Sequence, residues 1–200
     1  MARWEGNTRG RLVQAALDLF TEQGYDRTTV AQIARRANLT ERTFYRWFPD
    51  KREVLFGGSD ELVDRLISAI GSTPADTGAL PTLLGAFVAS REVIRPRAFL
   101  KERSKVIEST PPLRERELSK AASMCDALTA ALVARGCDPE TARLATEVAL
   151  AVIRLTSERW LADEQGDMER ALASSAADLL ALTADAVPGL ATAQGERPTD

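Results

Sequence analysis

The sequence predicts an all-α protein of about nine helices, with a small N-terminal head and a larger C-terminal body. Apolar residues recur at the i, i+3, i+4 spacing of amphipathic helices along most of the chain. No stretch alternates with period two over enough residues to compete as a strand, and clusters of β-branched residues are missing. Breaks rich in Gly and Pro divide the pattern into separate helices.

The most informative stretch of the head encodes two short helices joined by a tight turn. Thr29, with Gln32 three residues later, forms a capping box that begins the first helix, and Thr40 is a natural N-cap for the second. Asn38 lies between them, and Asn tolerates the left-handed conformation that such a turn needs. Pro49 ends the second helix. The pattern indicates a helix-turn-helix.

The second short helix carries two distinct faces. One apolar set recurs at i, i+3, i+4, and we expect it to face the core. A polar set with the same spacing lies about 200° away, because each residue of an α-helix turns by roughly 100°. The apolar set is Phe44, Trp47 and Phe48, and the outer set is Arg42, Tyr45 and Arg46. A helix with such an outer face is suited to the major groove of DNA.

A further capping box follows the second helix at once. Asp50 and Glu53 have the required spacing, which predicts one helix over about 51–70. Lys51 would then lie in the first turn of that helix. Backbone N–H groups at a helix start favour an anion, so Lys51 is well placed to contact a DNA phosphate.

This head resembles the DNA-binding domain of the TetR family of bacterial one-component regulators. The resemblance spans about residues 6–66, with the helix-turn-helix motif at about 29–48. Asn38 departs from it, since the family commonly has Gly there, as do Arg42, often a small residue, and Glu41, often polar or basic. The matching features are Ala15-Ala16-Leu19-Phe20, Gly24-Tyr25, Thr28-Thr29, Ile33-Ala34, Leu39-Thr40, Thr43-Phe44-Tyr45, Phe48 and Lys51.

Geometry and resemblance together predict two kinds of DNA contact. An arginine can donate two hydrogen bonds to a guanine edge, whereas hydroxyl groups and a lysine suit phosphate oxygens. Thr43 could touch a thymine methyl group, and Glu41 is expected to act mainly as a favourable charge at a helix N-terminus. The expected base readers are Arg42 and Arg46, the expected phosphate contacts are Thr28 or Thr29, Tyr45 and Lys51, and Trp47 completes the set.

The charge is distributed unevenly along the chain. The whole sequence has a net charge of −3. Residues 1–57 hold 10 Lys and Arg against 7 Asp and Glu, whereas residues 58–200 hold 16 against 22. A positive head on an acidic body would orient the protein on DNA through its electric field.

The body is predicted to be helical throughout. The resemblance implies that residues 67–187 form a ligand-binding and dimerisation domain. Residues 188–200 have little apolar content, and we expect a disordered tail. The expected helices of the body lie near 51–70, 80–93, 96–108, 112–135, 139–163 and 167–186.

The last two helices are expected to form a dimer interface. A single helix-turn-helix reads half a site, so a regulator of this design needs two heads about 34–36 Å apart. The resemblance implies a four-helix bundle with the same helices of a second subunit; the alternative is an ordinary intrachain core. The expected contacts are Val148, Val152, Leu155, Leu172, Ala176 and Leu179.

The middle helices are expected to enclose an effector pocket, with plain core packing as the alternative. A basic cluster on or beside 96–108 is either a solvated helix face or a site for the phosphates of a coenzyme-A thioester; it consists of Arg95, Arg97, Lys101, Arg103 and Lys105. Residues 48–61 and Arg159-Trp160-Leu161 resemble a TetR subgroup whose C-terminal domain is thought to bind acyl-CoA-like ligands. The expected pocket residues are Phe87, Phe99, Met124, Leu128, Thr156, Trp160, Arg97 and Lys101.

Composition argues against catalysis, a bound metal and a cofactor. The chain has no His, which removes the commonest general base and metal ligand. Its two cysteines lack zinc spacing, and there is neither a Gly-rich phosphate loop nor a nucleophile elbow. The longest apolar run, 148–153, is far too short for a membrane span, and no segment resembles a signal peptide. We therefore expect a cytoplasmic protein.

Two functions remain after these exclusions. The first is a repressor that binds a (pseudo)palindromic operator as a homodimer and is released by a small-molecule effector. The second is a helical small-molecule-binding protein whose head no longer reads specific DNA. A decayed head would be expected to lose Tyr45, Lys51 and the threonine caps, and all are present. The sequence therefore favours the regulator.

Overall fold

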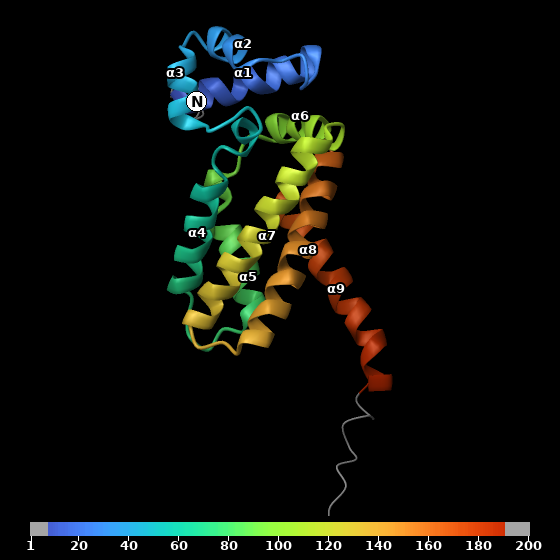
Figure 1. The fold of residues 1–200 in the computed structure, drawn as a ribbon. Coiled ribbons are helices and arrows are strands. Elements are labelled where there is room, and N and C mark those ends of the chain that lie inside the picture. Colours follow the sequence, from blue (N-terminus) through green and yellow to red (C-terminus); the bar gives the residue numbers. More distant parts are fainter. Residues whose placement is uncertain (1–7, 191–200) are drawn as a thin grey trace, which may run out of the picture.

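The computed structural model describes residues 8–190, and within that range it contains nine α-helices and no strand (Figure 1). The predicted all-α fold is confirmed. The head consists of α1 (Thr8–Gln23), α2 (Val30–Arg36) and α3 (Glu41–Trp47). The body follows as η1 (Glu53–Phe56), α4 (Ser59–Ser72), α5 (Ala79–Ala89), η2 (Arg91–Val93), α6 (Arg97–Glu108), α7 (Pro111–Ala134), α8 (Pro139–Ala162) and α9 (Met168–Leu190).

The local signals that define the head are present in the structure. Thr29 and Gln32 form both hydrogen bonds of the capping box at the start of α2. The Thr40 side chain caps α3 by accepting a hydrogen bond from the backbone N–H of Thr43. Asn38 has φ +53°, the left-handed conformation expected for the turn. These three features fix the angle between α2 and α3.

Two hydrophobic clusters hold the molecule together. The first lies in the head and includes Phe44, which is fully buried, and Phe48. Val106 and Ile107 of α6 belong to this same cluster, so α6 is packed directly beneath the head. The second cluster lies in the body and joins α4, α5, α7 and α8 around Leu66. In Figure 1, α6 lies crosswise between the head and the long body helices.

The single helix predicted over 51–70 is wrong. The chain forms the short turn η1, passes through Gly57 and Gly58, and only then begins α4. Gly58 has φ +105°, which side chains rarely adopt, and a Cβ at Gly57 would lie 3.0 Å from the Phe48 ring. The paired glycines therefore end the first segment.

The other helix boundaries differ less from the predictions. The helix expected over 80–93 ends at Ala89 and is followed by η2. The last helix extends to Leu190, past its expected end at 186 and over the first residues of the tail predicted for 188–200. The remainder of that tail, 191–200, lies outside the described residues. Every helix within residues 8–190 is too short or too polar to cross a membrane.

Candidate DNA interface and effector cavity

The outer face of α3 is exposed as predicted. Arg42 and Arg46 are exposed on it, and so is Tyr45, at 55% of its full surface. Glu41 lies in the first turn of the helix, and Thr43 is half-buried beside its cap. The structure therefore presents these side chains on one accessible surface of a capped helix.

Trp47 does not belong to the core face on which its spacing placed it. It is 44% exposed, whereas Phe44 and Phe48 are buried. Trp47 is the last residue of α3, and at this end of the helix its side chain is not packed into the core of the head. The Arg46 guanidinium lies 5.8 Å from the centre of the Trp47 ring. Trp47 is accessible at the end of the outer face.

The two threonines before α2 differ in position. The Thr28 side chain is buried, and its hydroxyl donates to the Gly24 carbonyl at 2.8 Å. The DNA contact predicted for Thr28 is thus corrected, because this hydroxyl holds the loop closed inside the head. Thr29 is exposed, and its side chain caps α2. Thr29 is the residue of the pair that is accessible.

Lys51 has partners within the head. Its Nζ donates to the carbonyls of Tyr25 and Thr28 at 2.7 and 2.9 Å, and it lies 3.9 Å from the centre of the Tyr25 ring. Partial burial lowers the pKa of Lys51 below its ordinary value. The helix turn in which the sequence placed this residue is absent, because η1 begins only at Glu53. The ammonium braces the loop before α2, and phosphate contact by Lys51 stays a prediction.

Arg11 is a structural residue of the head that the sequence did not single out. Its guanidinium, projecting from α1, donates to the Ala37 carbonyl and, at 3.2 Å, to the Asn38 carbonyl. These carbonyls lie at the turn between α2 and α3. Arg11 thus links α1 to the turn that orients α3, the candidate DNA-recognition helix.

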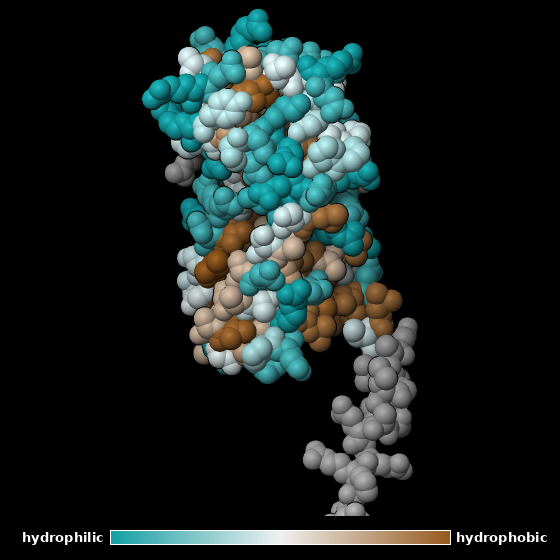
Figure 2. Space-filling view, in the orientation of Figure 1, coloured by the Kyte–Doolittle hydropathy of each residue, from teal (hydrophilic) through white to brown (hydrophobic). Residues whose placement is uncertain are grey.

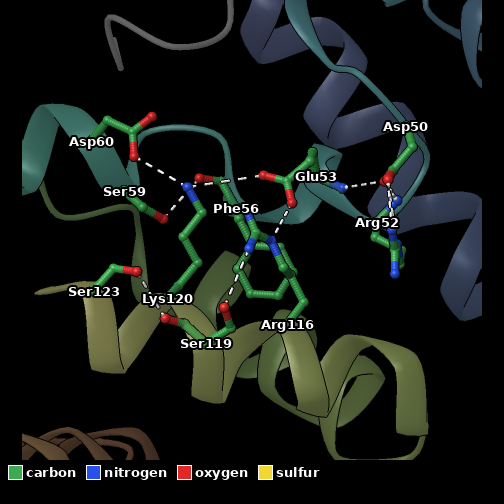
Figure 3. A network of polar contacts seen from close by, with 10 residues as sticks. All are labelled: Asp50, Arg52, Glu53, Phe56, Ser59, Asp60, Arg116, Ser119, Lys120 and Ser123. Carbon is green, nitrogen blue, oxygen red and sulfur yellow. Dashed lines mark hydrogen bonds and ion pairs between the residues drawn. The ribbon is translucent and has the colours of Figure 1, made fainter.

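Ionic contacts hold η1, the segment that follows the head, against α4 and α7 (Figure 3). The Glu53 carboxylate accepts a hydrogen bond from Arg116 of α7, and its second oxygen lies 3.9 Å from the Lys120 ammonium. Lys120 also pairs with Asp60 at 3.1 Å, at the start of α4. Only 16% of the Glu53 side chain is exposed. This network connects η1, α4 and α7.

Two arginines of the predicted basic cluster contact residues 55–57, in the segment that connects the head to α4. We call this connection the joint between head and body. Arg103 donates to the Leu55 carbonyl at 2.9 Å, and its guanidinium lies 5.0 Å from the centre of the Phe56 ring. Arg95 donates to the Gly57 carbonyl at 3.5 Å. Burial, together with repulsion from Arg9 and Arg103, lowers the pKa of Arg95 to about 10. The cluster is thus neither a simple solvated face nor one continuous phosphate site.

A cavity of about 500 Å³ lies between α5, α6, α8 and α9. It contains four of the predicted pocket residues, namely Phe87, Arg97, Thr156 and Trp160. The other four do not line it. Leu128 and Met124 pack in the body cluster, Phe99 packs against the head cluster, and Lys101 lies farther along α6. The remaining lining residues are Val88, Arg91, Ile94, Arg95, Pro96, Ile153, Ser157, Asp167, Met168, Glu169 and Leu172.

The predicted dimer residues are divided between the interior and the surface. Val152 is buried within the subunit, and Leu172 lines the cavity, so neither is available to a partner as predicted. Leu155 is 41% exposed, and Val148, Ala176 and Leu179 are half-buried. The most exposed leucines of the two helices are Leu144, Leu180 and Leu182, at 67%, 70% and 72%.

No metal-binding cluster is present in the part of the chain that the structure describes, where no three His, Cys, Asp or Glu side chains gather suitably. Cys125 and Cys137 are free thiols. Burial raises the pKa of the Cys125 thiol, which makes it less reactive. The geometry offers a surface for DNA and a cavity for a small molecule.

Comparisons with known proteins agree with this geometry. Residues 12–57 match the sequence profile of the family described as "Bacterial regulatory proteins, tetR family". The chain is 31% identical to the HTH-type transcriptional regulator TcmR of Streptomyces glaucescens, over 81% of this chain and 76% of that protein.

Solved structures share the fold over most of the chain. FadR of Bacillus subtilis in complex with stearoyl-CoA has a TM-score of 0.56 at 19% identity, covering 82% of this chain and 94% of that one. The SmeT–triclosan complex has a TM-score of 0.56 at 22% identity, covering 86% and 90%. At such low identities these likenesses establish the helical architecture alone.

Proposed function

The chain belongs to the TetR family of transcriptional regulators, and from that premise we propose that it is a repressor that binds operator DNA as a dimer and leaves it when a small molecule binds. Members of this family are DNA-binding regulators rather than enzymes. One observation carries the proposal for this chain. The outer face of α3 presents Arg42, Tyr45 and Arg46 to solvent, on a helix capped at its start and packed beneath by Phe44.

The proposed contacts with DNA follow from that face. Arg42 and Arg46 are the base readers, because both guanidinium groups are exposed and can bond guanine in a bidentate way. The exposed Tyr45 and Thr29 contact phosphates, and the exposed Trp47 lies at the C-terminal end of α3. Thr43 and Glu41 lie near the first turn, where bases are within reach.

In vitro selection from a random DNA pool tests the function. The proposal predicts enrichment of a two-fold symmetric site whose half-sites are about one helical turn or a multiple of it apart. Enrichment of no sequence by the properly folded chain would favour the alternative, a helical protein that binds small molecules without reading DNA. A site without symmetry would contradict the dimer.

The proposed dimer uses the exposed apolar faces of α8 and α9. Brown residues gather where α9 leaves the body in Figure 2. Leu144, Leu155 and Leu180 supply large apolar side chains, and several alanines of α9 would allow close approach of the partner's helices. We place the interface on these leucines, with Val148, Ala176 and Leu179 beside them, because large exposed apolar patches usually mark interfaces.

A charge on this face tests the dimer. Leu180→Lys should produce monomers in sedimentation, since Leu180 is 70% exposed and the subunit needs no repacking. The matched control is Leu118→Lys at 72% exposure on α7, a helix outside the proposed interface. If both variants sediment like the parent protein, the interface lies elsewhere.

The proposed effector site is the cavity between α5, α6, α8 and α9. Its volume of about 500 Å³ falls within the roughly 300–1,000 Å³ of small-molecule sites, and its walls are largely apolar. The related folds include one protein bound to stearoyl-CoA and one bound to triclosan. Phe99 and Met124, which the sequence predicts beside Phe87 in the pocket, lie outside the cavity, so we favour a molecule more compact than a coenzyme-A thioester. We place the protein in the cytoplasm, with its DNA.

A further inference from the structure

The cavity and the joint between head and body share one residue, Arg95. This side chain lines the cavity beside Arg97, and its guanidinium also reaches the Gly57 carbonyl at 3.5 Å. Gly57 packs against the ring of Phe48, the residue that directly follows α3. One side chain therefore reaches from the cavity to the backbone that supports the recognition helix.

The charged residues of the cavity leave an excess of positive charge. Arg91 is paired with Glu169 at 2.7 Å. The lining also includes Arg95, Arg97 and Asp167, whose carboxylate accepts the Glu169 N–H at 3.1 Å at the start of α9, so three arginines and two acids line the cavity. The rest of the wall is mainly aliphatic and aromatic. An apolar wall with an excess cation suits an amphiphile that carries an anionic group.

Arg97 is held by neutral groups. It donates to the Leu161 carbonyl at 3.3 Å and to the Asp163 carbonyl at the end of α8, and it lies 5.7 Å from the centre of the Trp160 ring. Within residues 8–190, Arg97 forms no ion pair. Carbonyls orient its guanidinium without neutralising it, and a carboxylate could accept two parallel hydrogen bonds from the same fork.

We propose that the effector is a compact amphiphile with a carboxylate, which binds Arg97 and Arg95 and draws Arg95 away from Gly57. This inference rests on the proposed function and names the ligand class of its cavity. At 3.5 Å the bond from Arg95 to Gly57 is at the long limit of hydrogen bonding, whereas a guanidinium–carboxylate bond is about 2.7–2.9 Å and roughly twice as strong as a neutral one. A carboxylate is therefore a stronger acceptor for Arg95 than this carbonyl.

The ligand class is tested by calorimetry on the full chain without DNA. The probes are decanoate and naphthalene-2-carboxylate, each beside its primary amide, which has nearly the same shape and no charge. At least one acid should bind about tenfold or more tightly than its amide, a difference that one charge-assisted contact supplies. Arg97→Gln should reduce this preference to about threefold or less, and Arg97→Lys should retain most of it.

The matched control is Lys105→Gln, on the same helix α6. The Lys105 side chain is 60% exposed and does not line the cavity, so the preference for the acid should be unchanged. The proposal is overturned if neither acid binds, if the amides bind as tightly as the acids, or if Arg97→Gln keeps the full preference. Thermal unfolding of each variant shows that the chain remains folded.

The link to the head is tested by Arg95→Met, which keeps the aliphatic stem and removes the donors. Affinity for the selected operator is measured without ligand and with saturating carboxylate, so that weaker ligand binding does not affect the comparison. On addition of the carboxylate, the DNA affinity of the parent protein should fall about tenfold or more, and that of the variant less than about threefold. An equal loss in both would refute the role of Arg95.

These outcomes can be told apart from a failure of the proposed function. The calorimetry involves no DNA, so it can reject the carboxylate while the operator selection still succeeds. Conversely, if the chain binds the carboxylate through Arg97 but selects no DNA, the proposed ligand class stands and the proposed regulatory function is rejected.

Discussion

Replacing Lys51 by methionine separates two roles that this residue could have. The side chain would keep its length and apolar stem but lose the ammonium group. In the structure that group donates to the carbonyls of Tyr25 and Thr28 and lies over the Tyr25 ring. If Lys51 is mainly a brace, the variant loses stability; if it contacts a phosphate, the variant loses DNA affinity in a salt-dependent way.

The expected loss of stability follows from these contacts. A hydrogen bond from a charged donor contributes roughly 1.5–3 kcal/mol when well shielded, and a partly exposed cation over a ring about 0.5–1 kcal/mol. Lys51 is only half-buried, and the Tyr25 carbonyl keeps a bond from the Thr28 N–H at 3.2 Å. We therefore take the low end for the site as a whole and expect Lys51→Met to lower the free energy of unfolding by about 2 kcal/mol.

Urea unfolding followed by circular dichroism measures this loss, and operator binding at several salt concentrations measures the other role. Arg52→Met is the matched control, since Arg52 is exposed and pairs with the nearby Asp50 at the surface, and we expect little change in its unfolding midpoint. An unchanged midpoint for Lys51→Met would refute the brace. A salt slope reduced by about one unit would show that Lys51 also neutralises a phosphate.

Three further outcomes are expected. Arg42→Ala should relax preference at one operator position by roughly 1–3 kcal/mol, and a uniform loss over all operator variants would reassign it to a phosphate. Thr40→Ala removes the cap of α3 and should cost about 1 kcal/mol in urea unfolding, whereas Thr40→Ser should cost little. Hydrogen bonds from the backbone and side chain of Thr141 hold the pKa of Asp138 below its ordinary value. The stability that this cap supplies is therefore fully present above the ordinary Asp pKa and is lost as the pH falls through the lower, folded value. Asp138→Asn, which can cap without titrating, should weaken that acid dependence, and an unchanged pH profile of unfolding would contradict it.

The head could be predicted well because its signals are local. Capping boxes, an αL residue and an i, i+3, i+4 stripe involve residues close in sequence, and Thr29, Asn38 and Thr40 behave as expected. Trp47 was placed by periodicity alone, which fails in the last turn of a short helix. Thr28 could not be assigned by sequence, because its burial depends on the position of α1.

The break after η1 could have been predicted from the sequence, whereas the contacts that hold the joint between head and body could not. The adjacent Gly57 and Gly58 are a sequence signal that the capping pattern at Asp50 outweighed in the prediction. By contrast, Arg103 and Arg116 act on residues about fifty or sixty positions earlier, and a pattern of charges says nothing about such partners. The charge pattern alone therefore predicts one basic surface. In the fold, Arg103 contacts the joint and Arg97 lines the cavity.

The most direct test of the account is a comparison of two duplexes at physiological salt, one carrying the selected operator and one with the same bases scrambled. Fluorescence anisotropy with the full chain should show at least about a thousandfold preference for the operator, as in specific protein–DNA complexes. A variant in which Arg42 and Arg46 are both alanine should lose most of that preference and retain weak, salt-dependent binding. Equal affinity of the parent protein for both duplexes would contradict the claim that α3 reads DNA.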